Sequence, residues 1–364
     1  MSAALPPQQA TASTVPFLDL ARSNGPVRDA VLAELADVID ANAFINGSQV
    51  AAFEEAFASY CGVAECVGVS SGLDALRLAL VAAGLEPGEH VAVPAATFAA
   101  TFEAVTQAGG IPVPVDVRDD SWLIDASAVP DVRFVMPVHL YGRVVDARAF
   151  PGRTVIADAC QAHGAHGAVD GSRAAAFSFY PGKNLGAFGD AGAVVTDDAE
   201  LAAHVRALRE HGQTAKYHHE REGWTARLDT LQAAALLHKL PLLDRSNAER
   251  RVAATVYGGL LSDVGDLRLP APAGAEHVWH LYVVRTADPD ALASFLRERG
   301  IGTGRHYPVP PHLSPAYAYL GLPEGSFPVT EQLSRECLSL PIFPGITKAE
   351  LTRVADAIAE YFDG

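Results

Sequence analysis

Apolar and polar residues along this chain alternate with two different periods. From residue 26 to 40, apolar side chains recur three or four positions apart, which predicts a helix with these inward-facing residues: Val27, Val31, Leu32, Leu35 and Val38. Pro26 suits its first turn, because the fixed φ and missing N–H of proline cost nothing there. A second helical pattern covers residues 50–60.

Short apolar runs then alternate with further helical patterns. The runs predict strands at 66–69, 90–93, 111–115, 134–138, 154–156, 174–179 and 192–196. Helices are expected among them at 73–83 and 98–108. This alternation is typical of βαβ units, so we expect an α/β fold with a mostly parallel sheet covered by helices on both faces.

The rest of the chain predicts a second, smaller domain. Helices are expected at 201–208 and 227–240, and Pro241 should end the second one. A Pro- and Gly-rich stretch then precedes a strand and two helices, at 280–285, 288–299 and 348–362. We therefore divide the chain into a disordered arm (1–15), a large domain (16–245) and a small C-terminal α+β domain (246–364).

Composition narrows the classes of function. Lys and Arg number 27 against 43 Asp and Glu, and the net charge of −16 disfavours nucleic-acid binding. No apolar run approaches the roughly 20 residues that span a bilayer. The N-terminus lacks the basic start and apolar core of a signal peptide, so we expect a cytoplasmic protein. Four cysteines without CxxC spacing, and histidines without HxxxH spacing, predict no metal site.

Lysine is rare in this chain, which has only Lys183, Lys216, Lys239 and Lys348. A buried ammonium can lose its proton and act as a nucleophile, which a guanidinium cannot do. Lys183 lies in the glycine-rich stretch 178–192, where it is either a Schiff-base lysine or an ordinary lysine in a surface turn. The glycines of this stretch lack GxGxxG spacing and precede a strand, which disfavours a dinucleotide site.

Three further segments carry candidate chemistry. Asp158 ends an expected strand, where parallel sheets place their ligands; alone it would be read as a helix N-cap. Paired with Lys183, it suits a pyridinium nitrogen held by Asp and an aldehyde held by Lys. Ser71 and Gly72 lie at a strand-to-helix turn whose N–H groups could bind phosphate. Phe98, at a similar turn, could stack on a planar ring or belong to the core.

Together these segments resemble the sugar aminotransferases of the DegT/DnrJ/StrS family. Members of this family are pyridoxal 5′-phosphate (PLP) enzymes with the aspartate-aminotransferase fold, PLP fold type I. The resemblance covers nearly the whole chain, with further matching segments at 16–20, 44–47, 137–142, 227–234 and 306–312. The lysine motif and the Asp–Gln–His motif at 158–163 are its most specific parts.

The resemblance implies roles for individual residues. Lys183 would bind the cofactor covalently and then carry a proton between the cofactor and the sugar carbon. Asp158 would keep the pyridine nitrogen protonated, Gln161 would hydrogen-bond the phenolic oxygen, and Phe98 would stack on the ring. The cofactor phosphate would be held by Ser71, Gly72, Leu73 and Ser178. The family often has threonine at position 73, so here only the backbone N–H of that residue remains.

The resemblance also implies a homodimer whose active sites are shared between two chains. The family usually has Asn at the position of Thr225, where it reaches the phosphate of the neighbouring subunit, and the shorter Thr puts this contact in question. The implied substrate contacts are His163, Tyr217, His306 and Tyr307. Tyr217 would belong to a loop over the mouth of the active site.

We therefore expect a PLP-dependent aminotransferase that converts a nucleotide-linked keto-6-deoxyhexose, with dTDP as the favoured nucleotide, to an amino sugar. L-Glutamate is the expected amino donor. The segment 306–312 resembles that of members that aminate the 3-keto position, with the 4-keto position as the alternative. Three competing functions are a sugar dehydratase, which would carry His in place of Lys183, a non-catalytic regulatory or sensor homologue, and a Rossmann oxidoreductase, which would need the missing GxGxxG.

Overall fold

A seven-stranded sheet forms the centre of the structure, a computed structural model that describes residues 14–364. The sheet order is β1-β7-β6-β5-β4-β2-β3. Only β7 runs antiparallel to its neighbours, and the other adjacent strands pair in parallel. The strands are β1 (Glu65–Val69), β2 (His90–Pro94), β3 (Ile111–Val115), β4 (Phe134–Val135), β5 (Thr154–Asp158), β6 (Ala174–Ser178) and β7 (Gly192–Thr196).

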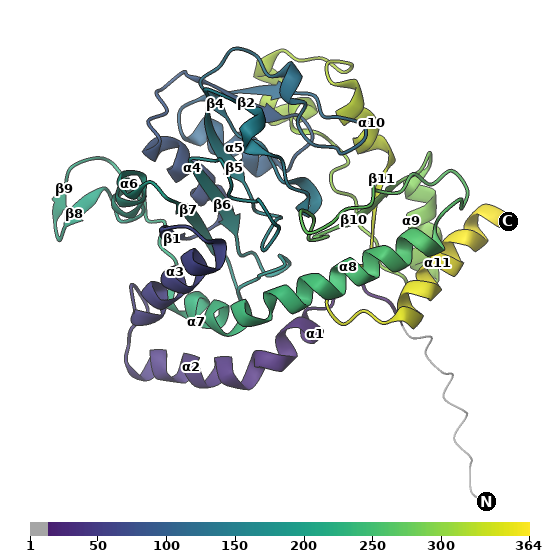
Figure 1. Cartoon of the computed structure of the whole chain (residues 1–364), viewed down its shortest axis with the longest axis horizontal. Coiled ribbons are helices and arrows are strands. Elements are labelled where there is room, and N and C mark those ends of the chain that lie inside the picture. Colours follow the sequence, from purple (N-terminus) through teal and green to yellow (C-terminus); the bar gives the residue numbers. More distant parts are fainter. Residues whose placement is uncertain (1–13) are drawn as a thin grey trace, which may run out of the picture.

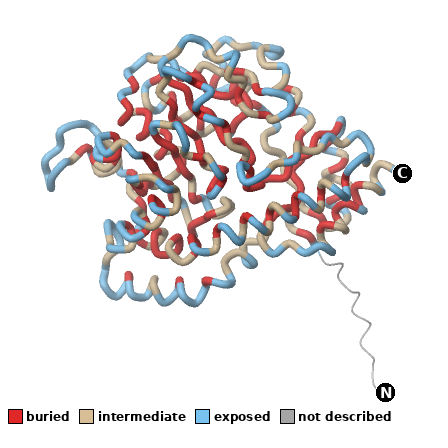
Figure 2. Tube along the Cα trace, in the orientation of Figure 1, coloured by how far each residue is buried: buried red, intermediate tan, exposed pale blue. Residues whose placement is uncertain are grey.

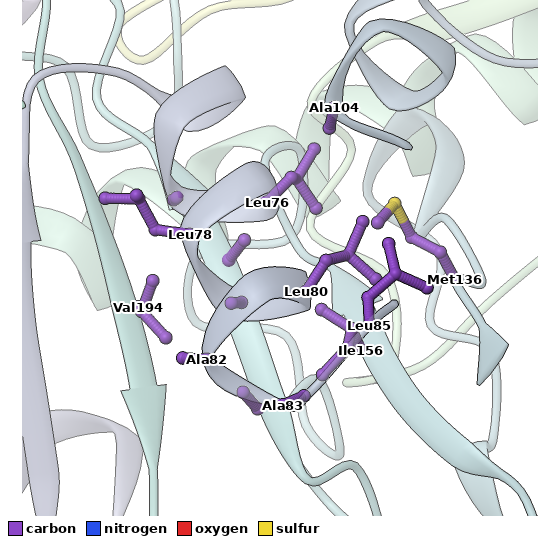
Figure 3. Close-up of a cluster of buried hydrophobic side chains, with 14 of the residues drawn as sticks. Leu76, Leu78, Leu80, Ala82, Ala83, Leu85, Ala104, Met136, Ile156 and Val194 are labelled. Carbon is purple, nitrogen blue, oxygen red and sulfur yellow. The ribbon is translucent and has the colours of Figure 1, made fainter. Parts of the chain in front are cut away.

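Helices cover both faces of this sheet, as Figure 1 shows. One face packs against α4 (Gly72–Ala82), α5 (Ala99–Gln107) and α6 (Ala199–Arg209). Figure 3 shows Leu76, Leu78 and Leu80 of α4 in one apolar cluster with Ile156 and Val194 of the sheet. The other face packs against α3 (Ser48–Cys61) and α7 (Thr230–Lys239). Strands buried on both faces read as apolar runs in the sequence, which is why they were predictable. Figure 2 shows this buried centre.

A smaller α+β unit follows the sheet. It consists of a two-stranded antiparallel sheet, β10 (Tyr282–Arg285) with β11 (Cys337–Leu340), and three helices: α9 (Pro289–Glu298), α10 (Pro328–Glu336) and α11 (Lys348–Asp363). The long helix α8 (Leu243–Leu260) connects the two units (Figure 1). Leu243 of α8 packs in the core of the large unit, and Tyr257 packs in the core of the small one.

The predicted α/β fold with a mostly parallel sheet is confirmed, and the bounds of β3 and β7 are as predicted. The prediction that the second helix ends at Pro241 is confirmed, because α7 ends at Lys239. Pro241 lies in a 3-10 turn (Leu240–Leu242) that leads into α8, a helix that the pattern did not reveal, and α8 runs through the expected domain boundary at 245. The pattern also missed α10 and β11. At the start of the chain, α1 (Leu20–Asn24) precedes α2 (Arg28–Asp40).

Most of the expected disordered arm lies outside the described residues. Its last residue, Val15, contradicts that expectation, because it is buried and forms a β-bridge with Ile301 of the small unit. Its N–H donates to the Gly300 carbonyl at 2.9 Å and its carbonyl accepts from the Gly302 N–H at 2.8 Å, so backbone pairing as well as burial holds Val15 against the small unit. Among residues 14–364, no helix has the length and apolar character needed to cross a membrane.

Candidate active site

A cavity of about 580 Å³ lies beyond the carboxyl ends of β5 and β6. This volume is within the usual range for sites that bind small molecules. The large unit contributes the strand ends and the turn before α4, and the small unit contributes residues near β10 and after Ile301. Ten of the residues predicted for the site line this cavity: Ser71, Gly72, Leu73, Phe98, Asp158, Gln161, Ser178, Lys183, His306 and Tyr307.

Lys183 lies in the tight loop that follows β6. The loop is closed by a hydrogen bond from the Lys183 N–H to the carbonyl oxygen of Tyr180, at 2.9 Å. A side chain at Gly186 would collide with the carbonyl of Pro181, so only glycine permits this compact loop. Burial lowers the pKa of the Lys183 ammonium, and the nearby Cys160 and Asp158 partly oppose this effect. The loop therefore holds an amine that gives up its proton more readily than an exposed lysine.

Asp158, the last residue of β5, is 5% exposed, and neighbouring donors fix its carboxylate. Its Oδ2 accepts a hydrogen bond from Thr101 Oγ1 at 2.9 Å, and its Oδ1 accepts one from the Cys160 N–H at 3.2 Å. Thr101 is in turn 2.7 Å from the hydroxyl of Thr97, so two hydroxyls support one carboxylate. This arrangement keeps an oriented negative charge in the same cavity as Lys183.

Gln161 has a fixed amide orientation. Its Oε1 accepts a 2.6 Å hydrogen bond from the Tyr141 N–H, and this leaves Nε2 as a donor toward the Tyr307 hydroxyl at 3.3 Å. The ring of Phe98, which is 54% exposed, lies 5.3 Å from the ring of Tyr307. An amide donor and an exposed aromatic face therefore meet at this part of the cavity.

The turn before α4 provides an anion site. Ser71 caps the helix through its Oγ, which accepts from the Asp74 N–H at 3.1 Å, while Gly72 and Leu73 are the first two helical residues. Their N–H groups have no carbonyl one turn earlier to bind, and the helix dipole adds positive potential. A Cβ at Gly72 would lie 2.5 Å from Ser178 Cβ, so glycine brings this turn close to the end of β6.

These features fit PLP. The free amides at Gly72 and Leu73 suit its phosphate, the oriented carboxylate of Asp158 suits its pyridine nitrogen, and the amine of Lys183 suits its aldehyde. Among residues 14–364, no group of three or more His, Cys, Asp and Glu side chains is placed to hold a metal ion.

The structure places His163 differently from the prediction. Its ring is fully buried between Phe177 and Phe179, and its Nε2 donates to the carbonyl oxygen of Ser178 at 2.8 Å. The ring does not line the cavity, so its expected direct contact with substrate is not supported. His163 instead supports the end of β6 from the core side of the strand. The motif did not reveal this, because a histidine next to a site motif can face either the cavity or the core.

Tyr217 and Thr225 also lie away from the cavity of their own chain. Tyr217 is 82% exposed between β8 (Gln213–Ala215) and β9 (His218–His219), a hairpin that projects at the far left of Figure 1. Thr225 is exposed, and its hydroxyl lies 3.2 Å from His211 Nε2. Within one chain the hairpin strands pair with each other and Tyr217 does not line the cavity, so the expected loop over the mouth of a shared active site stays a prediction.

His306 and Tyr307 line the cavity, as predicted for substrate contacts. His306 Nδ1 is 2.8 Å from Ser339 Oγ, and its ring stacks on Phe17 with centroids 5.5 Å apart. Burial lowers the pKa of His306 to about 4, and Lys183 adds to this shift.

Several cavity residues were not predicted for the site, among them Arg250 in α8 and His280 just before β10. Neither lies in a recognisable motif, and α8 itself was not predicted. For Arg250 the sequence holds one signal, an arginine at a position of α8 where the neighbouring inward-facing residues are apolar. This signal can be recognised only after the helix itself is known.

Comparison with known proteins gives a consistent result. The model of the DegT/DnrJ/EryC1/StrS aminotransferase family matches residues 27–359. A transaminase named for dTDP-3-amino-3,4,6-trideoxy-alpha-D-glucose, from Streptomyces venezuelae, is 45% identical over 95% of this chain and 96% of its own length. The crystal structure of S. venezuelae DesV is 44% identical, with a TM-score of 0.92 over 96% of this chain and 99% of that one.

A second solved structure, Bacillus subtilis NtdA, contains the bound cofactor PMP. It is 30% identical to this chain, with a TM-score of 0.89 over 98% of this chain and 87% of that one.

Proposed function

The chain belongs to the DegT/DnrJ/EryC1/StrS aminotransferase family, and from this membership we propose that it transfers the amino group of L-glutamate to the 3-keto carbon of a dTDP-linked keto-6-deoxyhexose. It is a PLP-dependent sugar aminotransferase. The burial of Lys183 in one cavity with Asp158 carries the proposal. The S. venezuelae relative, named for a dTDP-linked 3-amino sugar, supports the position and the nucleotide.

The residues on the sheet side of the cavity would hold the cofactor. Ser71, Gly72, Leu73 and Ser178 would bind its phosphate through backbone amides and hydroxyls. The carboxylate of Asp158 would keep a proton on the pyridine nitrogen, and Thr101 orients that carboxylate. When bound, PLP supplies an electron-withdrawing ring that stabilises negative charge on the carbon that loses its proton.

Lys183 would move the proton. Its Nζ can accept a proton from the donor's α-carbon and return one, because burial lowers the pKa of this ammonium and makes the neutral amine more accessible. Gln161 Nε2 and the Phe98 ring would fix the cofactor plane. His306 and Tyr307, at the other side of the cavity, would contact the sugar.

We place Tyr217 and Thr225 in the active site of a second copy of the chain. Both are exposed and lie outside their own cavity, although the resemblance gives them contacts with substrate and phosphate. A homodimer with shared sites accounts for both observations. The shorter side chain of Thr225 would then form at most one hydrogen bond across the interface.

Absorption spectroscopy tests the proposed function directly. We expect the protein with PLP to show a visible band that fades when L-glutamate is added, as the amine passes to the cofactor. Adding dTDP-linked 3-keto-6-deoxyglucose should restore the band, whereas the 4-keto isomer should not. A band that ignores glutamate but fades with another amino acid would overturn the donor. Recovery with only the 4-keto isomer would overturn the position.

A further inference from the structure

Arg250 is a buried cation without an acidic partner. Its side chain is 2% exposed, and among residues 14–364 no Asp or Glu forms an ion pair with it. Nη1 donates to three backbone carbonyls, at 3.2 Å from Trp279, 3.3 Å from His280 and 2.9 Å from Ile342, while the buried Nε has no partner. Burial lowers its pKa to about 10, which still leaves it protonated at neutral pH.

A buried charge is costly unless an opposite charge compensates it. The other fully buried arginine of the small unit shows the usual solution: Arg285 pairs with Glu336 at 2.8 Å and also with Asp119. Arg250 instead lines the cavity that contains Lys183. Its missing counter-ion can therefore come from a ligand in that cavity.

His280, the neighbouring cavity residue, is held in one tautomer. Asn184 Nδ2 donates to the Val278 carbonyl at 3.0 Å and to Asn247 Oδ1 at 2.9 Å, so Asn184 Oδ1 can only accept. His280 Nδ1, 3.2 Å from that oxygen, must carry the hydrogen. Burial lowers the pKa of His280 well below its usual value, with Lys183 and Arg250 adding to this, so the ring is neutral.

A neutral imidazole with hydrogen on Nδ1 offers a lone pair on Nε2. His280 Nε2 has no protein partner among the described residues, and it is not among the fully buried atoms that lack one. It therefore presents an acceptor at accessible surface of a residue that lines the cavity. Arg250 contacts the same residue, since its Nη1 donates to the backbone carbonyl of His280 at 3.3 Å, and its charge adds to the lowering of the His280 pKa.

One cation and one neutral acceptor side by side match the two charged groups of an α-amino acid. The carboxylate and the ammonium of such a ligand are attached to the same carbon, so they need adjacent partners of opposite character. A keto-sugar itself has neither group, and the diphosphate of a dTDP-linked sugar is an anion without an adjacent ammonium. The cofactor phosphate already has free helical amides at Gly72 and Leu73, on the sheet side of the cavity.

We propose that Arg250 and His280 form the subsite for the amino donor, in which the Arg250 guanidinium binds the α-carboxylate and His280 Nε2 accepts a hydrogen bond from the α-ammonium. The inference rests on the proposed function only in requiring that an amino acid be the amine source. It holds for any α-amino acid, because the side chain of the donor takes no part in it.

Calorimetric titration of the enzyme loaded with PMP, which has no carbonyl for an amino acid to condense with, tests this subsite with two probes. Glutarate has carboxylates but no ammonium, and α-methyl-L-glutamate has both groups but no α-hydrogen to lose. We expect Arg250→Met to weaken the binding of both probes by about 10- to 100-fold, the usual loss for a hydrogen bond to a charged group. Arg245→Met is the matched control, because Arg245 lies on the same helix with a side chain that is 82% exposed.

His280→Asn separates the two halves of the subsite. The asparagine amide can replace Nδ1–H toward Asn184 but has nothing in place of Nε2. We expect this variant to weaken the binding of α-methyl-L-glutamate by about 3- to 10-fold, the loss of one hydrogen bond. The affinity for glutarate should not change.

Several outcomes would overturn the proposal. Unchanged probe affinity in a folded Arg250→Met variant would do so, as would a wild-type enzyme that binds neither probe. Loss of PLP affinity, or a higher KM for the keto-sugar with unchanged glutarate binding, would assign Arg250 to those ligands instead.

If Arg250→Met does not fold, a crystal structure of the wild-type enzyme with glutarate decides, since the carboxylate must lie on Arg250. The proposed function fails separately. If L-glutamate leaves the absorption band unchanged while glutarate still requires Arg250, the donor is another amino acid and the subsite stands.

Discussion

The two walls of the cavity hold their charges by different means. The sheet wall, formed by Ser71, Asp158, Gln161, Ser178 and Lys183, places a carboxylate near an amine and adds free helical amides. The C-terminal wall, formed by Arg250, His280, His306 and Tyr307, has an arginine without an acid and two histidines that burial keeps neutral. The first wall provides a complementary partner for each polar part of a resident cofactor. The second leaves a charge unpaired, which suits ligands that arrive and leave.

Replacing the amine of the sheet wall should have the largest effect. In Lys183→Ala no side chain can bind the cofactor covalently or move the proton, so we expect turnover to fall by about 10³-fold or more. Steady-state amination of the keto-sugar measures this loss, and the visible band of the PLP-loaded protein should disappear with it.

Lys239 provides the matched control for this experiment. Burial also lowers the pKa of Lys239, to about 8, but its Nζ donates to Asn24 Oδ1 at 2.8 Å and it does not line the cavity. Lys239→Met should therefore keep nearly full turnover. Equal losses of turnover in the two variants would mean that the position of Lys183 in the cavity does not account for its effect on catalysis.

A smaller loss is expected when the carboxylate of the sheet wall becomes neutral. Asp158→Asn keeps the shape of the side chain but removes the charge that would hold a proton on the pyridine nitrogen. We expect the rate of the glutamate half-reaction to fall by about 100-fold, similar to the loss of one preorganised electrostatic contact. Stopped-flow absorbance measures this rate.

Thr101→Val separates the charge of Asp158 from its orientation, because it removes only the hydroxyl that donates to Asp158 Oδ2. The charge stays and its orientation is loosened, so about a 3- to 10-fold loss is expected, the contribution of one hydrogen bond. If Thr101→Val were as slow as Asp158→Asn, orientation rather than charge would dominate at this position.

The same difference between the walls explains what the sequence could predict. The sheet wall follows the ends of strands, so Asp158, Gln161, Ser178 and Lys183 come from two contiguous motifs. Ser71 follows from a third strand end. The residues of the C-terminal wall are isolated along the chain and meet only through tertiary packing. His306 and Tyr307 were found by resemblance alone.

Arg250 and His280 were not found because their roles depend on partners far along the chain. Ile342, for example, accepts a hydrogen bond from Arg250 across 92 positions. The error at His163 has the opposite cause: its motif was recognised, but a motif does not say which way a side chain faces. The expected position of the β8–β9 hairpin over an active site stays a prediction, because it depends on a second copy of the chain.

The smallest expected effect concerns the pH dependence of the C-terminal wall. Burial, together with the nearby Lys183, lowers the pKa of His306 to about 4, whereas an unfolded histidine titrates near 6.5. Between these values the unfolded chain binds a proton that the folded protein does not. His306 therefore lowers the free energy of unfolding as the pH falls below about 6.5, by about 1 kcal/mol at pH 6 compared with pH 8.

His306→Asn tests this slope, because its amide can still reach the Ser339 hydroxyl while it has nothing to titrate. Urea unfolding at pH 8 and pH 6 should show that the wild-type protein loses about 1 kcal/mol more than the variant over this interval. Only the difference between the two slopes matters, so the lost stacking on Phe17 and the titration of other buried histidines cancel. Parallel slopes would mean that the folded protein admits a proton at His306, and the C-terminal wall would then contain a second cation beside Arg250 at mildly acidic pH.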